Sequence, residues 1–163
     1  MLAWARPLLS VISGVAALVA ACGSVLANPA LLFDADSGKV LYAEDADDLW
    51  HPASVTKVMT AYLTFQHIKD GTIALDSKVV QSELSHSMPP SKIGLPIGGE
   101  LSVDLALQAL IVKSANDVAY MLAEKIGGSG DEFVKQMNFT AKRLGMTRTH
   151  FVNPNGLPAP EQV

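Results

Sequence analysis

Glycines divide the chain after residue 28 into a short extended region and longer glycine-free segments, and this division limits the folds that the chain can adopt. The apolar runs 30–33 and 40–43 are separated by a polar linker that contains Gly38, which is the pattern of a β-hairpin. The acidic residues that follow, at 45–48, predict a solvated turn. A strand pair therefore precedes the rest of the chain.

The longer segments carry apolar residues at helical spacing. The first predicted helix begins at Pro52, because proline is favoured in a first helical turn, and it ends before Gly71. Its apolar positions are Val55, Val58, Met59, Tyr62, Leu63 and Phe65. Ser102 is the expected N-cap of a second helix. Helices are predicted at 103–111, 116–126 and 131–144, and loops at 82–100, where Gly98-Gly99 could turn a small hairpin, and at 153–160.

Composition excludes several classes of function. The chain has 12 basic and 16 acidic side chains, and its formal charge of −4 without a basic stripe argues against nucleic acid as a partner. One cysteine excludes an internal disulfide framework and a cysteine zinc site. The four histidines are dispersed and form no His-Glu-x-x-His pattern, so neither a metal nor a cofactor is expected.

The N-terminal residues 1–27 are typical of a signal peptide. Residues 8–21 are apolar or small, and Val25-Leu26-Ala27 provides a cleavage site that would leave Asn28 first. Two alternatives remain open: lipidation of Cys22 in a lipoprotein-like box, or retention of residues 8–27 as an anchor. All three place the following residues outside the cytoplasm, in a periplasmic or membrane-associated location.

Ser54 and Lys57 form a Ser-x-x-Lys pattern at the start of the first predicted helix. Residues three positions apart share a helix face, so the Lys57 amine can reach the Ser54 hydroxyl. A serine needs an adjacent base to act as a nucleophile, and a lysine can serve when its pKa is lowered. A helix N-terminus also favours a nearby oxyanion. The pattern alone also arises by chance.

Ser114-Ala115-Asn116 lies between two predicted helices. On its own this triplet is common, because both polar residues can cap the helix that follows. Its occurrence after a helix-start Ser-x-x-Lys, in a chain with an export signal, makes a catalytic interpretation stronger than either motif does alone.

The two motifs together resemble those of the penicillin-binding serine DD-peptidases. The resemblance is strongest to the low-molecular-mass D-alanyl-D-alanine carboxypeptidases, which trim peptidoglycan stem peptides, and it spans roughly residues 30–160. The segments that carry it are 37–41, 51–60, 114–117 and 144–157. It implies an α/β (α+β) fold of the β-lactamase/DD-peptidase type, with an antiparallel sheet and a helical lobe, over residues 28–163.

The resemblance also implies roles for individual residues. Ser54 would attack the D-Ala-D-Ala peptide bond and form an acyl-enzyme, with its backbone N–H supplying half of the oxyanion hole. Lys57 would take the Ser54 proton, and Ser114 would relay a proton to the leaving nitrogen. Asn116 would orient the substrate amide and hold Lys57. The implied partners are the peptidoglycan pentapeptide stem and, as inhibitors, β-lactams.

One departure from the family pattern concerns the third motif. No Lys-Thr-Gly, Lys-Ser-Gly or His-Thr-Gly follows Asn116. We therefore expect a fragment that lacks the C-terminal strands, and a 163-residue chain that is inactive and poorly stable alone. A non-catalytic remnant, a membrane-tethered binding module and a DD-endopeptidase are the alternatives. A β-lactamase is disfavoured, because no Glu-x-x-Leu-Asn segment follows Asn116.

Overall fold

The computed structural model describes residues 29–163, and these residues divide into two compact units, one ending at Asp48 and one comprising Leu49–Val163. The predicted signal peptide, the Cys22 alternative and the anchor alternative lie outside the described residues. Within the described part, no helix combines the length and the apolar character needed to cross a membrane. Each unit is described by itself below.

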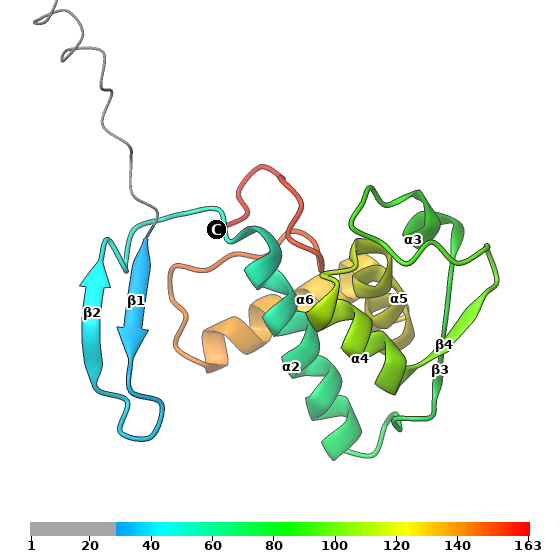
Figure 1. Ribbon diagram of the computed structural model, residues 1–163, viewed down its shortest axis with the longest axis horizontal. Helices are drawn as coiled ribbons and strands as arrows, with labels where there is room; N and C mark the ends of the chain where they lie inside the picture. Colours follow the sequence, from blue (N-terminus) through cyan, green and yellow to red (C-terminus); the bar gives the residue numbers. More distant parts are fainter. Residues whose placement is uncertain (1–28) are drawn as a thin grey trace, which may run out of the picture. The chain divides into compact units, whose positions relative to one another are not determined.

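The first unit contains the predicted hairpin. Strands β1 (Ala30–Phe33) and β2 (Val40–Glu44) pair antiparallel, with Leu31 opposite Ala43 and Leu32 opposite Tyr42 (Figure 1). Gly38 adopts a φ of 70° in the connecting turn, where the Asp34 carboxylate accepts hydrogen bonds from Ser37. A two-stranded hairpin has no second layer of its own, and the apolar side chains of both strands are exposed.

The second unit is mainly helical and contains one small sheet. Its helices are the 3₁₀ turn η1 (Ala53–Val55), α2 (Thr56–Lys69), α3 (Glu83–Ser87), α4 (Val103–Val112), α5 (Asn116–Gly127) and α6 (Gly130–Arg143). Its sheet pairs β3 (Lys78–Val80) with β4 (Glu100–Ser102) antiparallel. The described chain is thus a mixed α/β fold with small antiparallel sheets, as predicted.

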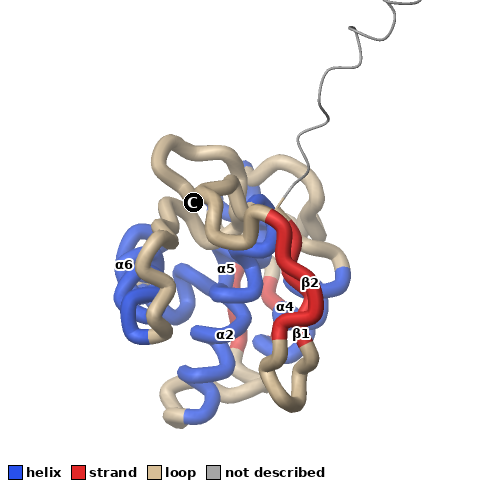
Figure 2. Tube along the Cα trace, turned by 90° about the vertical axis from the view of Figure 1, so that its left-hand side faces the viewer, coloured by secondary structure: helices blue, strands red, loops and turns tan. Residues whose placement is uncertain are grey.

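Helix α5 is the centre of this unit. It packs against α2, α3, α4 and α6 (Figure 1), and α2, α4 and α6 are again seen around it in Figure 2. Val118, Ala119, Leu122 and Ala123 of this helix are fully buried. The apolar side chains of α5 are buried on several sides by these neighbouring helices. This packing holds the start of α5 in a defined position.

Most predicted helix boundaries are confirmed. The Ser102 hydroxyl accepts a hydrogen bond from the Leu105 N–H and caps α4, and Gly128 ends α5 with a φ of 79°. The apolar pattern of the first helix is only partly a core pattern: Met59 and Leu63 are buried. The other members of that pattern, Val55, Val58, Tyr62 and Phe65, are exposed.

The prediction that residues 82–100 form a loop is wrong at Glu83–Ser87, which is helix α3. Ser82 caps it through a reciprocal pair with Ser85, whereas the usual signal for such a pair is glutamate or glutamine. The Gly98-Gly99 turn does not join two strands of its own. Instead, Gln81 bonds to both glycines and aligns β3 with β4.

Candidate active site

The Ser54 hydroxyl and the Lys57 amine meet at the N-terminal end of α2. Ser54 is exposed in the turn η1, and Lys57 is the second residue of α2 and only 2% exposed. The Lys57 Nζ donates to the Ser54 Oγ at 3.2 Å. The contact predicted from the i,i+3 spacing is therefore present, although Ser54 belongs to the 3₁₀ turn rather than to the α-helix proper.

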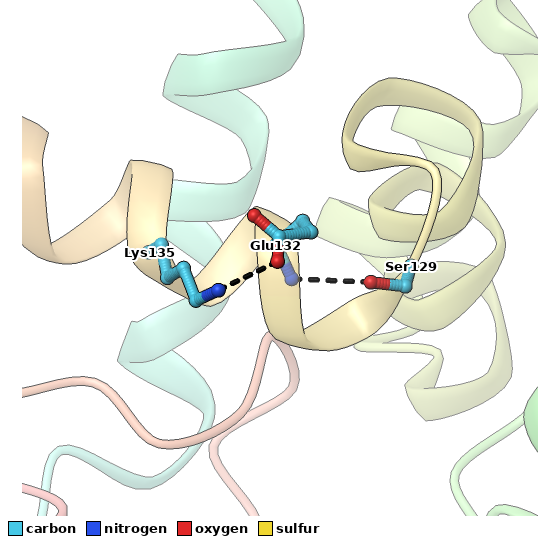
Figure 3. Close-up of polar contacts among 3 residues, drawn as sticks. All are labelled: Ser129, Glu132 and Lys135. Atoms are coloured by element: carbon cyan, nitrogen blue, oxygen red, sulfur yellow. Dashed lines mark hydrogen bonds and ion pairs between the residues drawn. The ribbon is translucent and has the colours of Figure 1, made fainter.

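Burial gives Lys57 an unusual electrostatic environment. Removal from water lowers the pKa of Lys57 below its usual 10.5, because burial penalises the ammonium form. Lys135 on α6 shows the ordinary behaviour of a helix-surface lysine: its hydrogen bond to Glu132 raises its pKa (Figure 3). Of these two lysines, Lys57 therefore has the lower pKa.

A backbone carbonyl from the C-terminal loop completes the surroundings of Lys57. The Asn155 oxygen accepts a hydrogen bond from Nζ at 2.6 Å, and the neighbouring Pro154 oxygen accepts one from the Thr60 hydroxyl at 2.6 Å. Gly156 lies so close that a Cβ there would stand 1.8 Å from the Ala53 oxygen. The loop 153–156 therefore forms one wall beside the Ser54 turn.

This wall was assigned no role from the sequence. The sequence predicts a turn-rich segment at 153–160, and residues 144–157 carry part of the family resemblance. Neither predicts the contact to Lys57, because that contact uses a main-chain atom that every residue possesses. The close approach of Gly156 is the sole part with a sequence signal, because only glycine fits where a backbone lies this near.

The second motif lies at the junction of α4 and α5. Ser114 has a φ of 55° and is partly buried, and Asn116 is the first residue of α5 and 5% exposed. Helix α5 begins without a side-chain cap, so capping does not account for the Ser114-Ala115-Asn116 triplet. The Asn116 Nδ2 donates to the carbonyls of Pro89 and Pro90 at 3.0 and 3.3 Å.

The loop 88–91 connects the two motifs. Its Met88 sulfur accepts a hydrogen bond from the Asn155 side chain at 3.5 Å, and its Ser91 oxygen accepts one from the Asn116 N–H at 2.7 Å. At Lys57, the acceptor beside the Ser54 hydroxyl is the Asn155 carbonyl, whereas the Asn116 amide is bound to the loop. The predicted role of Asn116 in holding Lys57 stays a prediction.

Non-glycine residues with a positive φ occur at both motifs, and also at Asp45 and Glu161. Ala53, immediately before Ser54, has a φ of 46°, and Ser114 has a φ of 55°. Left-handed conformations are costly for residues with a Cβ and often occur at functional sites.

No group of His, Cys, Asp or Glu in residues 29–163 could hold a metal ion.

A profile of the D-alanyl-D-alanine carboxypeptidases, peptidase family S11, matches residues 16–163. The chain belongs to this family. It is 43% identical over 131 residues to the D-alanyl-D-alanine carboxypeptidase DacF of Bacillus subtilis, an alignment that covers 80% of this chain and 34% of the relative. The chain thus spans about a third of the length of this curated relative.

Solved structures of D-alanyl-D-alanine carboxypeptidases and penicillin-binding proteins superpose on this chain. The D-alanyl-D-alanine carboxypeptidase DacD of Francisella tularensis superposes with a TM-score of 0.78 at 35% identity, over 90% of this chain and 38% of that one. The cefotaxime-bound penicillin-binding protein D2 of Listeria monocytogenes superposes with a TM-score of 0.70 at 32% identity, over 83% of this chain and 55% of that one.

Proposed function

We propose that this chain supplies the nucleophile and its base to a serine-type D-Ala-D-Ala carboxypeptidase that removes the terminal D-alanine from peptidoglycan stem peptides. The observation that carries the proposal is the exposed Ser54 hydroxyl 3.2 Å from a buried Lys57 whose pKa is lowered. The family membership agrees with it. An extracytoplasmic location, set by the predicted signal peptide and compatible with membrane association, would bring the site to its substrate.

The geometry suits acyl transfer when Lys57 is neutral. A neutral amine has two N–H groups and one lone pair; one N–H can donate to the Asn155 carbonyl while the lone pair faces the Ser54 hydroxyl. Lys57 then takes the proton as the Ser54 oxygen attacks the carbonyl carbon of the D-Ala-D-Ala bond.

Collapse of the tetrahedral intermediate breaks the C–N bond. The leaving D-alanine nitrogen gains a proton, for which Ser114 is the proposed relay, and the shortened peptide remains esterified to Ser54. Water hydrolyses this ester, the carboxylate leaves, and the hydroxyl of Ser54 is restored. A β-lactam would enter by the same first step, which is the basis for expecting inhibition.

The experiment is covalent labelling with a penicillin. Intact-mass analysis should show one penicilloyl group on the wild-type chain, and peptide mapping should place it on Ser54. Ser54→Ala should carry none, and Lys57→Ala should label far more slowly. Lys135→Ala, which removes an exposed lysine on α6, is the matched control and should label normally. Adduct formation that survives in Ser54→Ala would overturn the assignment.

A second assay separates the enzyme activities. A synthetic pentapeptide stem and a cross-linked dimer would be incubated with the chain, and the products identified by mass. Release of D-alanine from the first supports the carboxypeptidase, whereas cleavage of only the second supports the DD-endopeptidase. A chain that labels with penicillin but releases neither product fits a non-catalytic role.

A further inference from the structure

Asp117, which directly follows Asn116, is a fully buried carboxylate that binds main-chain amides. Its two oxygens accept hydrogen bonds from the N–H groups of Ile93 and Gly94, at 3.0 and 2.8 Å for the shorter contacts, and from that of Val118 at 2.9 Å. Several N–H donors and the positive end of α5 offset the cost of burying the charge. Two of the donors come from a loop more than twenty positions earlier in the chain.

The same loop is held at its other end by Asn116. The Asn116 side-chain amide donates to Pro89 and Pro90, and its backbone N–H donates to Ser91. Asn116 and Asp117 therefore form hydrogen bonds with opposite ends of the loop 89–94. Since the hydrogen bonds of the Asn116 side-chain NH₂ group within residues 29–163 go to carbonyls of that loop, the position of this group depends on where the loop is fixed.

We propose that Asp117 is a positioning residue of the site: its carboxylate fixes the loop 89–94 and thereby holds the side-chain amide of Asn116 in place. The proposal deepens the proposed function and rests on it, because Asn116 is the member of the second motif assigned to the substrate. Asp117 itself contacts neither Ser54 nor Lys57 in this structure, so its effect is exerted through Asn116.

The required chemistry is that of a carboxylate. An asparagine has the same shape but offers one acceptor oxygen and an NH₂ group, and in either orientation this group faces an N–H donor, that of Val118 or those of Ile93 and Gly94. Asp117→Asn therefore leaves at least one buried N–H without an acceptor. The matched control is Asp131→Asn, because Asp131 is also the second residue of its helix but is exposed.

The test that needs no activity uses NMR hydrogen exchange on the 163-residue chain. In Asp117→Asn, the amides of Ile93 and Gly94 and the side-chain amide of Asn116 should all exchange about tenfold faster or more, as expected on loss of one charge-assisted hydrogen bond. Asp131→Asn should leave all three unchanged. Faster exchange at Ile93 and Gly94 with an unaltered Asn116 side chain would overturn the proposal.

If Asp117→Asn does not fold, a second variant and a measurement on the unaltered chain still test the proposal. Asp117→Ser has a smaller side chain and removes the carboxylate oxygens that bind Ile93 and Gly94, and it should give the same exchange pattern. In the unaltered chain, the Asn116 side-chain amide and the amides of Ile93 and Gly94 should open together, with similar exchange protection. An Asn116 amide that exchanges much faster than both loop amides would refute the link between them.

The penicillin reaction then distinguishes positioning from simple loss of fold. Asp117→Asn should lower the rate constant for labelling Ser54 about tenfold while the final labelled fraction stays at the wild-type value. A purely structural role would reduce the labelled fraction and leave the rate constant of the folded molecules unchanged. Absence of label in the wild-type chain would count against the proposed function alone, and the exchange experiment would still decide the role of Asp117.

Discussion

At the scale of single residues, the proposed reaction depends on one amine that is buried away from water, that of Lys57. Burial of Lys57 does two things at once: it lowers the pKa, and it restricts the amine to partners on the Ser54 turn and the 153–156 loop. An exposed lysine at the same spacing would keep its usual pKa and would be less available as a proton acceptor.

The lowered pKa predicts how labelling depends on pH. The rate of Ser54 acylation should rise with pH as Lys57 loses its proton and then reach a plateau. The midpoint of this rise should lie below pH 10.5. Lys57→Met, which keeps the volume and removes the base, should slow labelling by about 10²–10⁴-fold and abolish this dependence. A midpoint at or above 10.5 in the wild-type chain would contradict the argument.

The same shift predicts a change in stability with pH. The folded chain binds the Lys57 proton more weakly than the unfolded chain does. Burial of the charged amine therefore lowers the unfolding free energy, and the whole of this penalty is present at pH values below the pKa of Lys57 in the folded chain. This penalty should diminish as pH rises from the folded pKa towards 10.5. Urea unfolding across that interval should show the wild type gaining unfolding free energy relative to Lys57→Met as the pH rises. A constant difference would count against burial as the cause.

Gly156 provides a steric prediction at the same scale. In Gly156→Ala, the new methyl group would overlap the Ala53 oxygen, and the residue would also have to keep a φ of 80°. We expect a loss of at least about 2 kcal/mol in unfolding free energy and a large loss of labelling.

Gly145→Ala is the matched control for this substitution. Gly145 has a φ of 77° and open space around it, so the control should lose only the backbone part, about 1 kcal/mol, and should label normally. Equal losses in the two variants, measured by urea denaturation, would mean that the contact with Ala53 has no energetic weight.

At the scale of secondary-structure elements, boundaries with a local chemical cause were predictable and those without one were not. Gly71, Ser102 and Gly128 marked helix ends because each residue acts on the backbone beside it. Helix α3 was missed because its cap pairs two serines, a combination with little predictive weight. Sequence spacing predicted the contact between Ser54 and Lys57 but, apart from Gly156, gave no signal for the loops that contact them.

The cap of α6 allows a test at this scale. The Ser129 hydroxyl accepts the Glu132 N–H at 3.2 Å (Figure 3), so Ser129→Ala should reduce the unfolding free energy by about 1 kcal/mol. Ser129→Asn retains an acceptor and should recover most of the loss. Chemical denaturation of the three proteins decides the matter, and identical midpoints would show that the cap adds nothing.

At the scale of the whole molecule, the two units differ in how much apolar surface they cover. The second unit buries α5 among four helices, whereas the hairpin leaves Leu31, Leu32 and Leu41 more than half exposed. Local stability follows the number of buried contacts, so the units should not open with the same free energy.

Hydrogen exchange on the 163-residue chain measures this difference directly. We expect the amides of β1 and β2 to exchange near the rate of an unfolded peptide, because an isolated two-stranded hairpin is marginal. Amides in the middle of α5 should exchange only by global unfolding. Equal protection of the hairpin and α5 would show that the chain is stable as one unit.

The rate of D-alanine release by the 163 residues can also be predicted. The 163 residues contain no Lys-Thr-Gly motif, and loss of one oxyanion donor costs on the order of 10²–10³ in rate. We expect D-alanine release from a pentapeptide stem to be slower by at least this factor than in the Bacillus subtilis relative, measured side by side. Comparable turnover, together with a cooperative thermal melt, would overturn the expectation of an inactive chain.

The hydrogen bond between Lys57 and the Asn155 carbonyl has a consequence for genetics. No codon change at position 155 can delete a peptide oxygen, so a saturation library at that position would retain the acceptor in every member. Such a library would report on the side chain alone. Weakening the acceptor takes backbone chemistry, for example a semisynthetic protein with an ester in place of the amide between residues 155 and 156.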